Sequence, residues 1–216
     1  SAASDVYKRQ KKKMIYVKLN IDNTIEYAKN VYTTEEGELI LNFKANPELM
    51  KKYGFKELID SPVEFDANYQ TYTVSYVEDA DTITKQYSIV YLPIETLKEV
   101  KLKELADYDI SEDVNGFILN DKTAWFDKDT RAALSTSIES ALLLGESTIT
   151  FVVNDKEFSI DIPKAKQMLA AVQRYADKCF LVTEAHKRAI KGLTEVEEII
   201  NYDVTTGYPT KVTFSL

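Results

Sequence analysis

The chain has 216 residues, of which 44% are apolar, and it carries a formal net charge of −8 at pH 7. This apolar content, with only six glycines and five prolines, excludes global disorder and allows one large domain or two small ones. The single cysteine excludes an internal disulfide, and no run approaches the roughly 18 apolar residues of a membrane-spanning helix, so we expect a soluble protein.

The first ten residues, SAASDVYKRQ, resemble a translated sequencing-adapter remnant, which makes Met14 the expected initiator. The alternative is a natural, basic and disordered tail, and in both cases residues 1–13 are set aside from the fold. Because they carry five basic residues and one acidic residue, the net charge of the remainder moves from −8 to −12. Such an acidic domain is a poor ligand for nucleic acid or anionic membranes, so we expect neither partner.

Residues 14–92 predict a β-rich module of hairpins with one short helix. Residues 14–20 alternate apolar and polar side chains, and the following Ile21-Asp22-Asn23 is typical of a hairpin turn. Further along, Asn46-Pro47 is typical of a helix cap and first turn, and Gly54 closes that helix.

The most distinctive part of this module is a tyrosine-rich hairpin over residues 69–91. Strand alternation places four tyrosines on one face: Tyr72, Tyr76, Tyr87 and Tyr91. Tyrosine surfaces bind glycans or proteins, because the ring supplies contact area and the hydroxyl supplies a hydrogen bond. Ordinary cross-strand aromatic pairing explains the same pattern, and we favour it while keeping these residues as a candidate interaction surface. Residues 93–107 then predict a helix that connects two modules.

Residues 108–216 predict a C-terminal α+β domain that contains a repeat. FILNDKTAWFD begins at Phe117 and FVVNDKEFSID begins at Phe151, and each reads as a strand, an Asn-Asp turn and a return strand. Each copy ends in an aspartate suited to cap a following helix, Asp127 and Asp161. We expect two ββα units that share a small antiparallel sheet with helices on one face. The first helix, residues 128–144, is expected to bury Leu134, Ile138 and Leu142.

The second helix of the repeat, residues 163–193, is the longest helical pattern in the chain. Residues seven apart form a predicted packing seam along it: Ala165, Val172, Cys179, His186 and Leu193. A short helix follows, for which Thr194 and Glu197 predict a capping box, and then a final strand over residues 211–216.

The only cysteine and the only histidine, Cys179 and His186, are the residues on which a catalytic site would depend. Seven residues of helix separate them by roughly 10.5 Å, too far to share a zinc ion or to form a nucleophile–base pair. The sequence also has no glycine-rich phosphate loop, nucleophile elbow or zinc-protease motif. We therefore predict no catalytic residues, no cofactor and no metal site.

Three segments carry a resemblance to a known family: VNGFILNDKTAWFDKDTR, YADKCFLVTEAHKRAIKGL and YDVTTGYPTKVTF. They resemble a domain of unknown function that recurs at the C-terminus of bacteriophage and prophage proteins, beside tail-fibre and tail-assembly genes. The likeness covers residues 108–214, and the residues 14–92 are more loosely similar to a small module of phage structural proteins. Its motif residues are Trp125, Arg131, Tyr175, Cys179, His186, Tyr202, Asp203, Gly207, Tyr208 and Pro209.

The resemblance implies a viral context and a structural or assembly role, and it supplies no catalytic residues. We therefore expect a non-enzymatic accessory protein of the phage tail or baseplate, whose partners are other tail proteins or further copies of itself. The rival hypothesis is a module that binds a glycan or small molecule through the tyrosine-rich hairpin. The expected location is the host cytoplasm, with incorporation into the virion left open.

Overall fold

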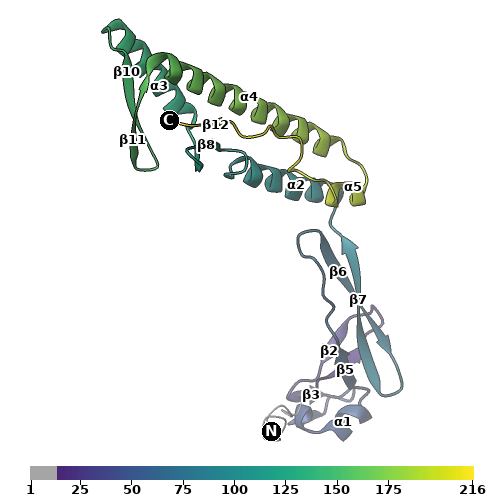
Figure 1. Cartoon of the computed structure of the whole chain (residues 1–216). Coiled ribbons are helices and arrows are strands. Elements are labelled where there is room, and N and C mark those ends of the chain that lie inside the picture. The colour runs from purple at the N-terminus through teal and green to yellow at the C-terminus, as the bar shows by residue number, and fades with distance from the viewer. Residues whose placement is uncertain (1–13) are drawn as a thin grey trace, which may run out of the picture. The chain divides into compact units, whose positions relative to one another are not determined.

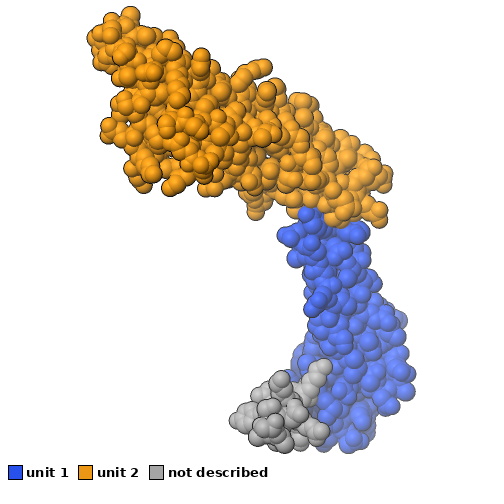
Figure 2. Space-filling model, viewed as in Figure 1, with its two compact units in different colours: residues 1–92 blue, residues 93–216 orange. Residues whose placement is uncertain are grey.

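The computed structural model describes residues 14–216, so the predictions for residues 1–13 lie outside the described part. The α+β fold class is confirmed (Figure 1). The chain divides into two compact units, one ending at Leu92 and the other beginning at Pro93, coloured separately in Figure 2. Within residues 14–216, no helix combines the length and the apolar character that crossing a membrane requires.

The first unit is built on a five-stranded sheet with the order β2-β1-β5-β7-β6. Strands β5 and β7 are parallel, and the other neighbouring pairs are antiparallel. The predicted turn between the first two strands is confirmed, with Asn23 in the left-handed region at φ 61°. The strands are β1 (Tyr16–Leu19), β2 (Ile25–Tyr27), β5 (Lys56–Asp60), β6 (Gln70–Glu78) and β7 (Thr82–Tyr91).

A smaller β-hairpin and two short helices complete the first unit. Asn46 caps the α-helix as predicted, because its side chain accepts a hydrogen bond from the Leu49 amide, and Pro47 occupies the first turn. Aromatic rings hold these pieces together, with Phe43 stacked on Tyr32 at a centroid distance of 4.5 Å. The elements are β3 (Val31–Thr33), β4 (Leu39–Leu41), the 3₁₀ helix η1 (Phe43–Ala45) and α1 (Pro47–Lys52).

The second unit has its core between four helices and two small sheets (Figure 1). The predicted Asn-Asp turns of the repeat are confirmed, since Asn120, Asp121, Asn154 and Asp155 all have positive φ between 48° and 62°. Its elements are α2 (Ile94–Asp109), β8 (Phe117–Leu119), β9 (Lys122–Ala124), α3 (Lys128–Leu143), β10 (Thr148–Val153), β11 (Lys156–Asp161), α4 (Ile162–Gly192), α5 (Val196–Ile200) and β12 (Thr213–Phe214).

The prediction that the two hairpins of the repeat share one antiparallel sheet is wrong. Hairpin β10–β11 forms a sheet of its own, whereas β8–β9 is extended by the last strand, β12. The reason is that β12 occupies the free edge of β8 in parallel orientation. The Ile118 amide donates to the Val212 carbonyl at 2.8 Å, and the Asn120 amide donates to the Phe214 carbonyl at 3.0 Å.

Three further predictions, about two helix caps and one buried residue, are only partly right or wrong. Asp127 caps α3 as expected by accepting from the Thr130 amide at 2.7 Å, but Asp161 makes no side-chain cap bond to α4. Leu142, expected in the core, is 44% exposed because it lies in the last turn of α3, where the neighbouring Ala141 faces inward. The predicted capping box of α5 is not formed, since the helix begins one residue later with Glu195 at its N-cap.

Helix α2, expected to connect two modules, belongs to the second unit. One face of this helix, comprising Leu97, Lys101 and Leu105, is buried. Leu105 packs in one cluster with Ile190 of α4 and with Val204 from the loop after α5. Burial of a complete helical face gives α2 a share in the core, which a solvated connector does not have.

Candidate functional site

Helix α4 organises the second unit. Its 31 residues span about 46 Å, and along this length it packs against α2, α3 and the two small sheets. The predicted seam is buried over four of its five positions, and Leu193 lies just beyond the helix. The N-terminal half of the seam packs on the two hairpins, and the C-terminal half packs on α2 and on the chain's last segment. The buried residues are Ile162, Ala165, Met168, Val172, Tyr175, Cys179, Thr183, His186 and Ile190.

His186 is held at both ring nitrogens. Its Nε2 lies 2.8 Å from the carbonyl oxygen of Thr206, and its Nδ1 lies 2.7 Å from the hydroxyl of Tyr202. Because a carbonyl only accepts, Nε2 carries a proton and donates to Thr206, and the Tyr202 hydroxyl is the partner of Nδ1. The imidazole also stacks on Tyr208 at 5.8 Å. His186 therefore fastens the C-terminal segment to α4.

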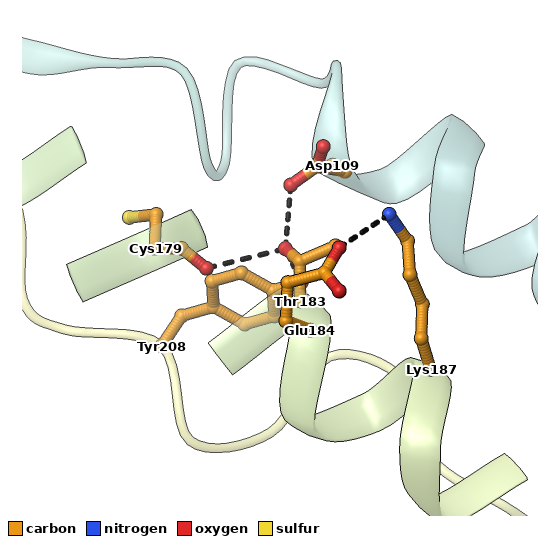
Figure 3. Close-up of polar contacts among 6 residues, drawn as sticks. All are labelled: Asp109, Cys179, Thr183, Glu184, Lys187 and Tyr208. Atoms are coloured by element: carbon orange, nitrogen blue, oxygen red, sulfur yellow. Dashed lines mark hydrogen bonds and ion pairs between the residues drawn. The ribbon is translucent and has the colours of Figure 1, made fainter. Parts of the chain in front are cut away.

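One turn earlier, Thr183 continues this network (Figure 3). Its hydroxyl lies 2.6 Å from Asp109 Oδ1 at the end of α2 and 2.9 Å from the Tyr208 hydroxyl. The hydroxyl also lies 3.2 Å from the carbonyl oxygen of Cys179. Both the carboxylate and this carbonyl only accept, so the single Thr183 proton goes to the nearer of them, Asp109, and Tyr208 donates to Thr183. The resulting chain of hydrogen bonds, Tyr208 to Thr183 to Asp109, joins three segments through a residue that is 2% exposed.

An ion pair lies beside this chain of hydrogen bonds. Lys187 Nζ approaches Glu184 Oε1 at 2.8 Å, as Figure 3 also shows. The hydrogen bond from Lys187 lowers the pKa of Glu184, and the same bond raises the pKa of Lys187. Both side chains are partly exposed, so this pair contributes little to stability compared with the buried hydrogen bonds.

Closer to the N-terminus of α4, Cys179 and Tyr175 both contact the backbone carbonyl of Val114. The Tyr175 hydroxyl donates to the Val114 carbonyl at 3.0 Å, and the Cys179 sulfur lies 4.0 Å from the same oxygen. Burial raises the pKa of the Cys179 thiol, so the thiolate that a nucleophile requires is disfavoured. Burial likewise raises the pKa of Tyr175.

Trp125 and Arg131 extend this cluster toward the N-terminal half of α4. The Trp125 ring meets the Tyr175 ring edge-on at 6.3 Å, and the Arg131 guanidinium lies 5.3 Å from the Trp125 ring centroid. Arg131 also donates from Nε to Gln173 Oε1 at 2.8 Å, which ties α3 to α4. These contacts bridge the two helices at one end of the groove described next.

A groove of about 800 Å³ runs between α3 and α4. Its apolar lining is made of small or aliphatic side chains with one aromatic, Phe180, which is 61% exposed. Its charged lining has both signs. The lining residues are Lys128, Arg131, Ala132, Ser135, Ile138, Glu139, Lys166, Leu169, Ala170, Gln173, Ala176, Asp177 and Phe180. An apolar floor with a few convergent polar groups is the usual composition of a binding site.

The four tyrosines of the predicted interaction surface lie on one face of the β6–β7 hairpin. The strand register pairs them with residues of that face: Tyr72 with Ile89, Tyr76 with Lys85, Tyr87 with Val74 and Tyr91 with Gln70. Tyr72 and Tyr91 are the most exposed of the four, at 42% and 50%.

Two tyrosines of this face, Tyr72 and Tyr87, already contact other residues of the first unit. The Tyr87 hydroxyl donates to Asp60 Oδ1 at 2.6 Å, which raises the pKa of Tyr87, and the Tyr72 ring packs between Phe65 and Tyr87. Tyr72 and Tyr91 therefore offer more open aromatic surface than Tyr87 does.

The motif residues of the C-terminal resemblance come together to a large extent. Trp125, Arg131, Tyr175, Cys179, His186, Tyr202 and Tyr208 form one chain of contacts along α4. Asp203 instead closes its own turn by accepting from the Thr205 amide, which lowers its pKa, and Gly207 adopts φ +79°. Pro209 is half-buried, directly after Tyr208.

Sequence reasoning missed Thr183, Asp109 and the groove. The signal for Thr183 was available, because it lies one helical turn beyond Cys179 and shares its face. Nothing local marks Asp109, which becomes a partner only when the end of α2 meets α4. Cys179 and His186 share a face as predicted, and each has its own separate partners.

Comparison of the chain with protein-family models, with curated proteins and with solved structures finds no match. Among residues 14–216, no three His, Cys, Asp or Glu side chains lie close enough together to hold a metal ion.

Proposed function

We propose that this protein is a non-enzymatic accessory protein of a phage tail or baseplate, and that it works by binding another protein in the α3–α4 groove. The observation that carries the proposal is the groove itself, an apolar trough between two helices with the exposed Phe180 in its lining. The viral setting rests on the sequence resemblance of residues 108–214.

The chemistry of α4 favours binding over catalysis. The thiol of Cys179 is buried and held in its protonated form, and both nitrogens of His186 are used in structural hydrogen bonds. A general base needs a free nitrogen within reach of a substrate, and a thiol nucleophile needs a lowered pKa. Neither condition holds at these two residues.

The occupant that best fits the groove is an amphipathic helix of the partner. Two packed helices leave a straight trough in which a third helix can insert apolar side chains at positions i, i+3, i+4 and i+7. Small residues in the floor, Ala132, Ser135 and Ala170, let such a helix approach closely. Lining charges of both signs, such as Lys166 and Glu139, suit a partner helix that carries both signs at its edges.

The test is co-purification with the products of the neighbouring tail genes. Ala170→Arg places a long charged side chain in the groove and should abolish capture of the partner. The matched control is Ala185→Arg, which adds the same side chain to an exposed position of the same helix outside the groove lining. Arginine is a good helix former, so both variants should keep the fold. Equal capture of the partner by both variants would show that the partner does not bind in the groove.

A second candidate function is glycan binding at the tyrosine face, favoured by the shared orientation of Tyr72, Tyr76, Tyr87 and Tyr91. Stacking of sugar rings needs open aromatic faces, which Tyr72 and Tyr91 supply. A glycan array tests it. This function would be favoured over the first if the array signals disappear when Tyr72 and Tyr91 are replaced by serine and no tail protein is captured by the groove.

A further inference from the structure

The groove between α3 and α4 is lined by charges that follow the same order on both helices. On α3, Lys128 precedes Glu139 by eleven positions. On α4, Lys166 precedes Asp177 by the same distance. Eleven residues make about three helical turns, so both members of each pair lie on the face that lines the groove. Each helix therefore presents a lysine toward its N-terminus and an acidic residue toward its C-terminus.

Helices α3 and α4 run antiparallel along this groove. Arg131, in the first turn of α3, donates from Nε to Gln173 Oε1 at 2.8 Å. Two turns later on α3, Ile138 lies beside Leu169, which precedes Gln173 by one turn of α4. Positions 131 and 173 therefore lie at one level, and positions increase in opposite directions from there.

The two charge pairs are centred at the same level of the groove. The pair on α3 is centred between residues 133 and 134, and the pair on α4 is centred between residues 171 and 172. With positions 131 and 173 side by side, the two centres differ by about one residue, or about 1.5 Å along the helices. A single two-fold axis at this level can therefore set the lysine of each pair opposite the acidic residue of the same pair in a second copy.

The uncharged residues of this face have the same symmetry. Near the common centre, the small side chains of Ala132, Ser135 and Ala170 let two backbones approach closely. Phe180, which is 61% exposed, lies about 13 Å from the centre toward one end of the groove. Leu142, one turn beyond Ile138 and 44% exposed, lies about 13 Å from the centre toward the other end. The same axis therefore brings Phe180 of one copy to the level of Leu142 of the other.

The charges of the groove have room for such partners. Within residues 14–216, Lys128, Glu139 and Lys166 make no ion pair and no side-chain hydrogen bond. Asp177 accepts one hydrogen bond from Gln173 Nε2 at 2.7 Å, and a carboxylate can accept several more. A second copy can therefore pair all four charges without breaking a contact inside the chain.

We propose that the groove of the free protein is covered by the groove of a second copy. Helix α3 lies antiparallel on α3 of the second copy and α4 lies antiparallel on α4, which gives a four-helix arrangement. An isologous contact requires a surface that is complementary to itself. The mirrored order of charges, small residues and exposed apolar residues meets this requirement, and it selects a second copy as the occupant.

The size of the contact makes this dimer weak. The face is about 26 Å long between the levels of Leu142 and Phe180 and about 18 Å wide across two helices, which gives about 500 Å² per copy. Stable complexes bury about 800 Å² per partner. The inference deepens the proposed function and rests on it in one respect: the dimer covers the groove until a tail partner takes the place of the second copy.

Sedimentation velocity of the whole protein over a concentration series tests the dimer. Lys128→Glu sets acidic residues opposite each other at two symmetric places, and it should weaken dimerisation by roughly tenfold. Glu139→Lys should do the same with lysines. An equimolar mixture of the two variants should form heterodimers, because each variant supplies the charge that the other lacks. The double variant Lys128→Glu/Glu139→Lys should dimerise like the wild type.

The matched control is Lys178→Glu, which makes the same change of charge at an exposed position of α4 outside the groove lining. It should leave the dimer unchanged. Both α3 variants should keep the fold, because an acidic residue near the start of a helix and a basic residue nearer its end suit the helix dipole.

A wild type that stays monomeric at its highest soluble concentration overturns the proposal, and if it still captures a tail partner, the proposed function stands without it. The proposal also fails if the equimolar mixture forms no more dimer than either variant alone. Equal weakening by Lys178→Glu would contradict the pairing, and a dimer that survives Ala170→Arg would place the contact outside the groove. A dimer that follows every expectation while no tail protein is captured would instead count against the proposed function.

Discussion

Replacing Thr183 by valine tests the buried hydrogen bonds that join α2, α4 and the C-terminal segment. Valine keeps the shape and the β-branched side chain, so the helix propensity of the site is nearly unchanged and only the hydroxyl is lost. The hydroxyl's contacts are with the Asp109 carboxylate at 2.6 Å, the Tyr208 hydroxyl at 2.9 Å and, more weakly, the Cys179 carbonyl at 3.2 Å. A hydrogen bond to a charged group contributes about 1.5–3 kcal/mol, so we expect the second unit to lose about 2 kcal/mol.

Urea unfolding followed by tryptophan fluorescence measures this loss in the right part of the chain. The protein has one tryptophan, Trp125, which lies in the second unit against Tyr175 and therefore reports that unit. Thr183→Ser is the control, because it keeps the hydroxyl and removes one methyl group, at about 1 kcal/mol. A Thr183→Val variant within about 0.5 kcal/mol of wild type, or less destabilised than Thr183→Ser, would refute the argument.

Three further predictions concern the same unit. Burial raises the pKa of Cys179 and of Tyr175, so the folded state binds these protons more tightly than the unfolded state does. The free energy of unfolding measured by urea should therefore stay constant near neutral pH. It should fall as the pH rises above the ordinary pKa values, 9.0 for cysteine and 10.0 for tyrosine, because the unfolded state then loses protons that the folded state keeps. A thiol reagent should label Cys179 only when the unit opens, so a labelling rate equal to that of a free thiol would contradict its burial. Asp127→Ala should cost about 1 kcal/mol through loss of the α3 cap, whereas Asp161→Ala should cost little, as thermal melts of the two variants can show.

Features that depend on neighbours along the chain could be predicted from the sequence. The seven-residue spacing from Ala165 to His186 indicates a buried seam because helix geometry puts those side chains on one face. The Asn-Asp pairs at 120–121 and 154–155 indicate left-handed turns because these two residues tolerate positive φ. Strand alternation likewise put the four tyrosines on one face of the hairpin.

Features that depend on distant partners could not be predicted. The edge of β8 can pair with any strand, because backbone hydrogen bonds carry no sequence information, and β12 takes it from almost a hundred residues away. Thr183 finds Asp109 only after α2 packs on α4. The groove has no sequence signature of its own, since it is the space left between α3 and α4 once their packed faces have met.

Helix α4 thus has two roles on two sides. Its buried seam ties the C-terminal segment and α2 into one unit, and its side toward α3 lines the proposed binding groove. The polar residues Cys179 and His186, which first suggest chemistry, belong to the seam.

Amide hydrogen exchange of the protein alone and bound to its co-purified tail partner tests the account most directly. We predict that partner binding slows exchange along the groove, in residues 131–139 of α3 and 166–180 of α4, and leaves the Ala170→Arg variant unprotected. Protection confined to the β6–β7 hairpin, or protection of the groove that persists in Ala170→Arg, would contradict it.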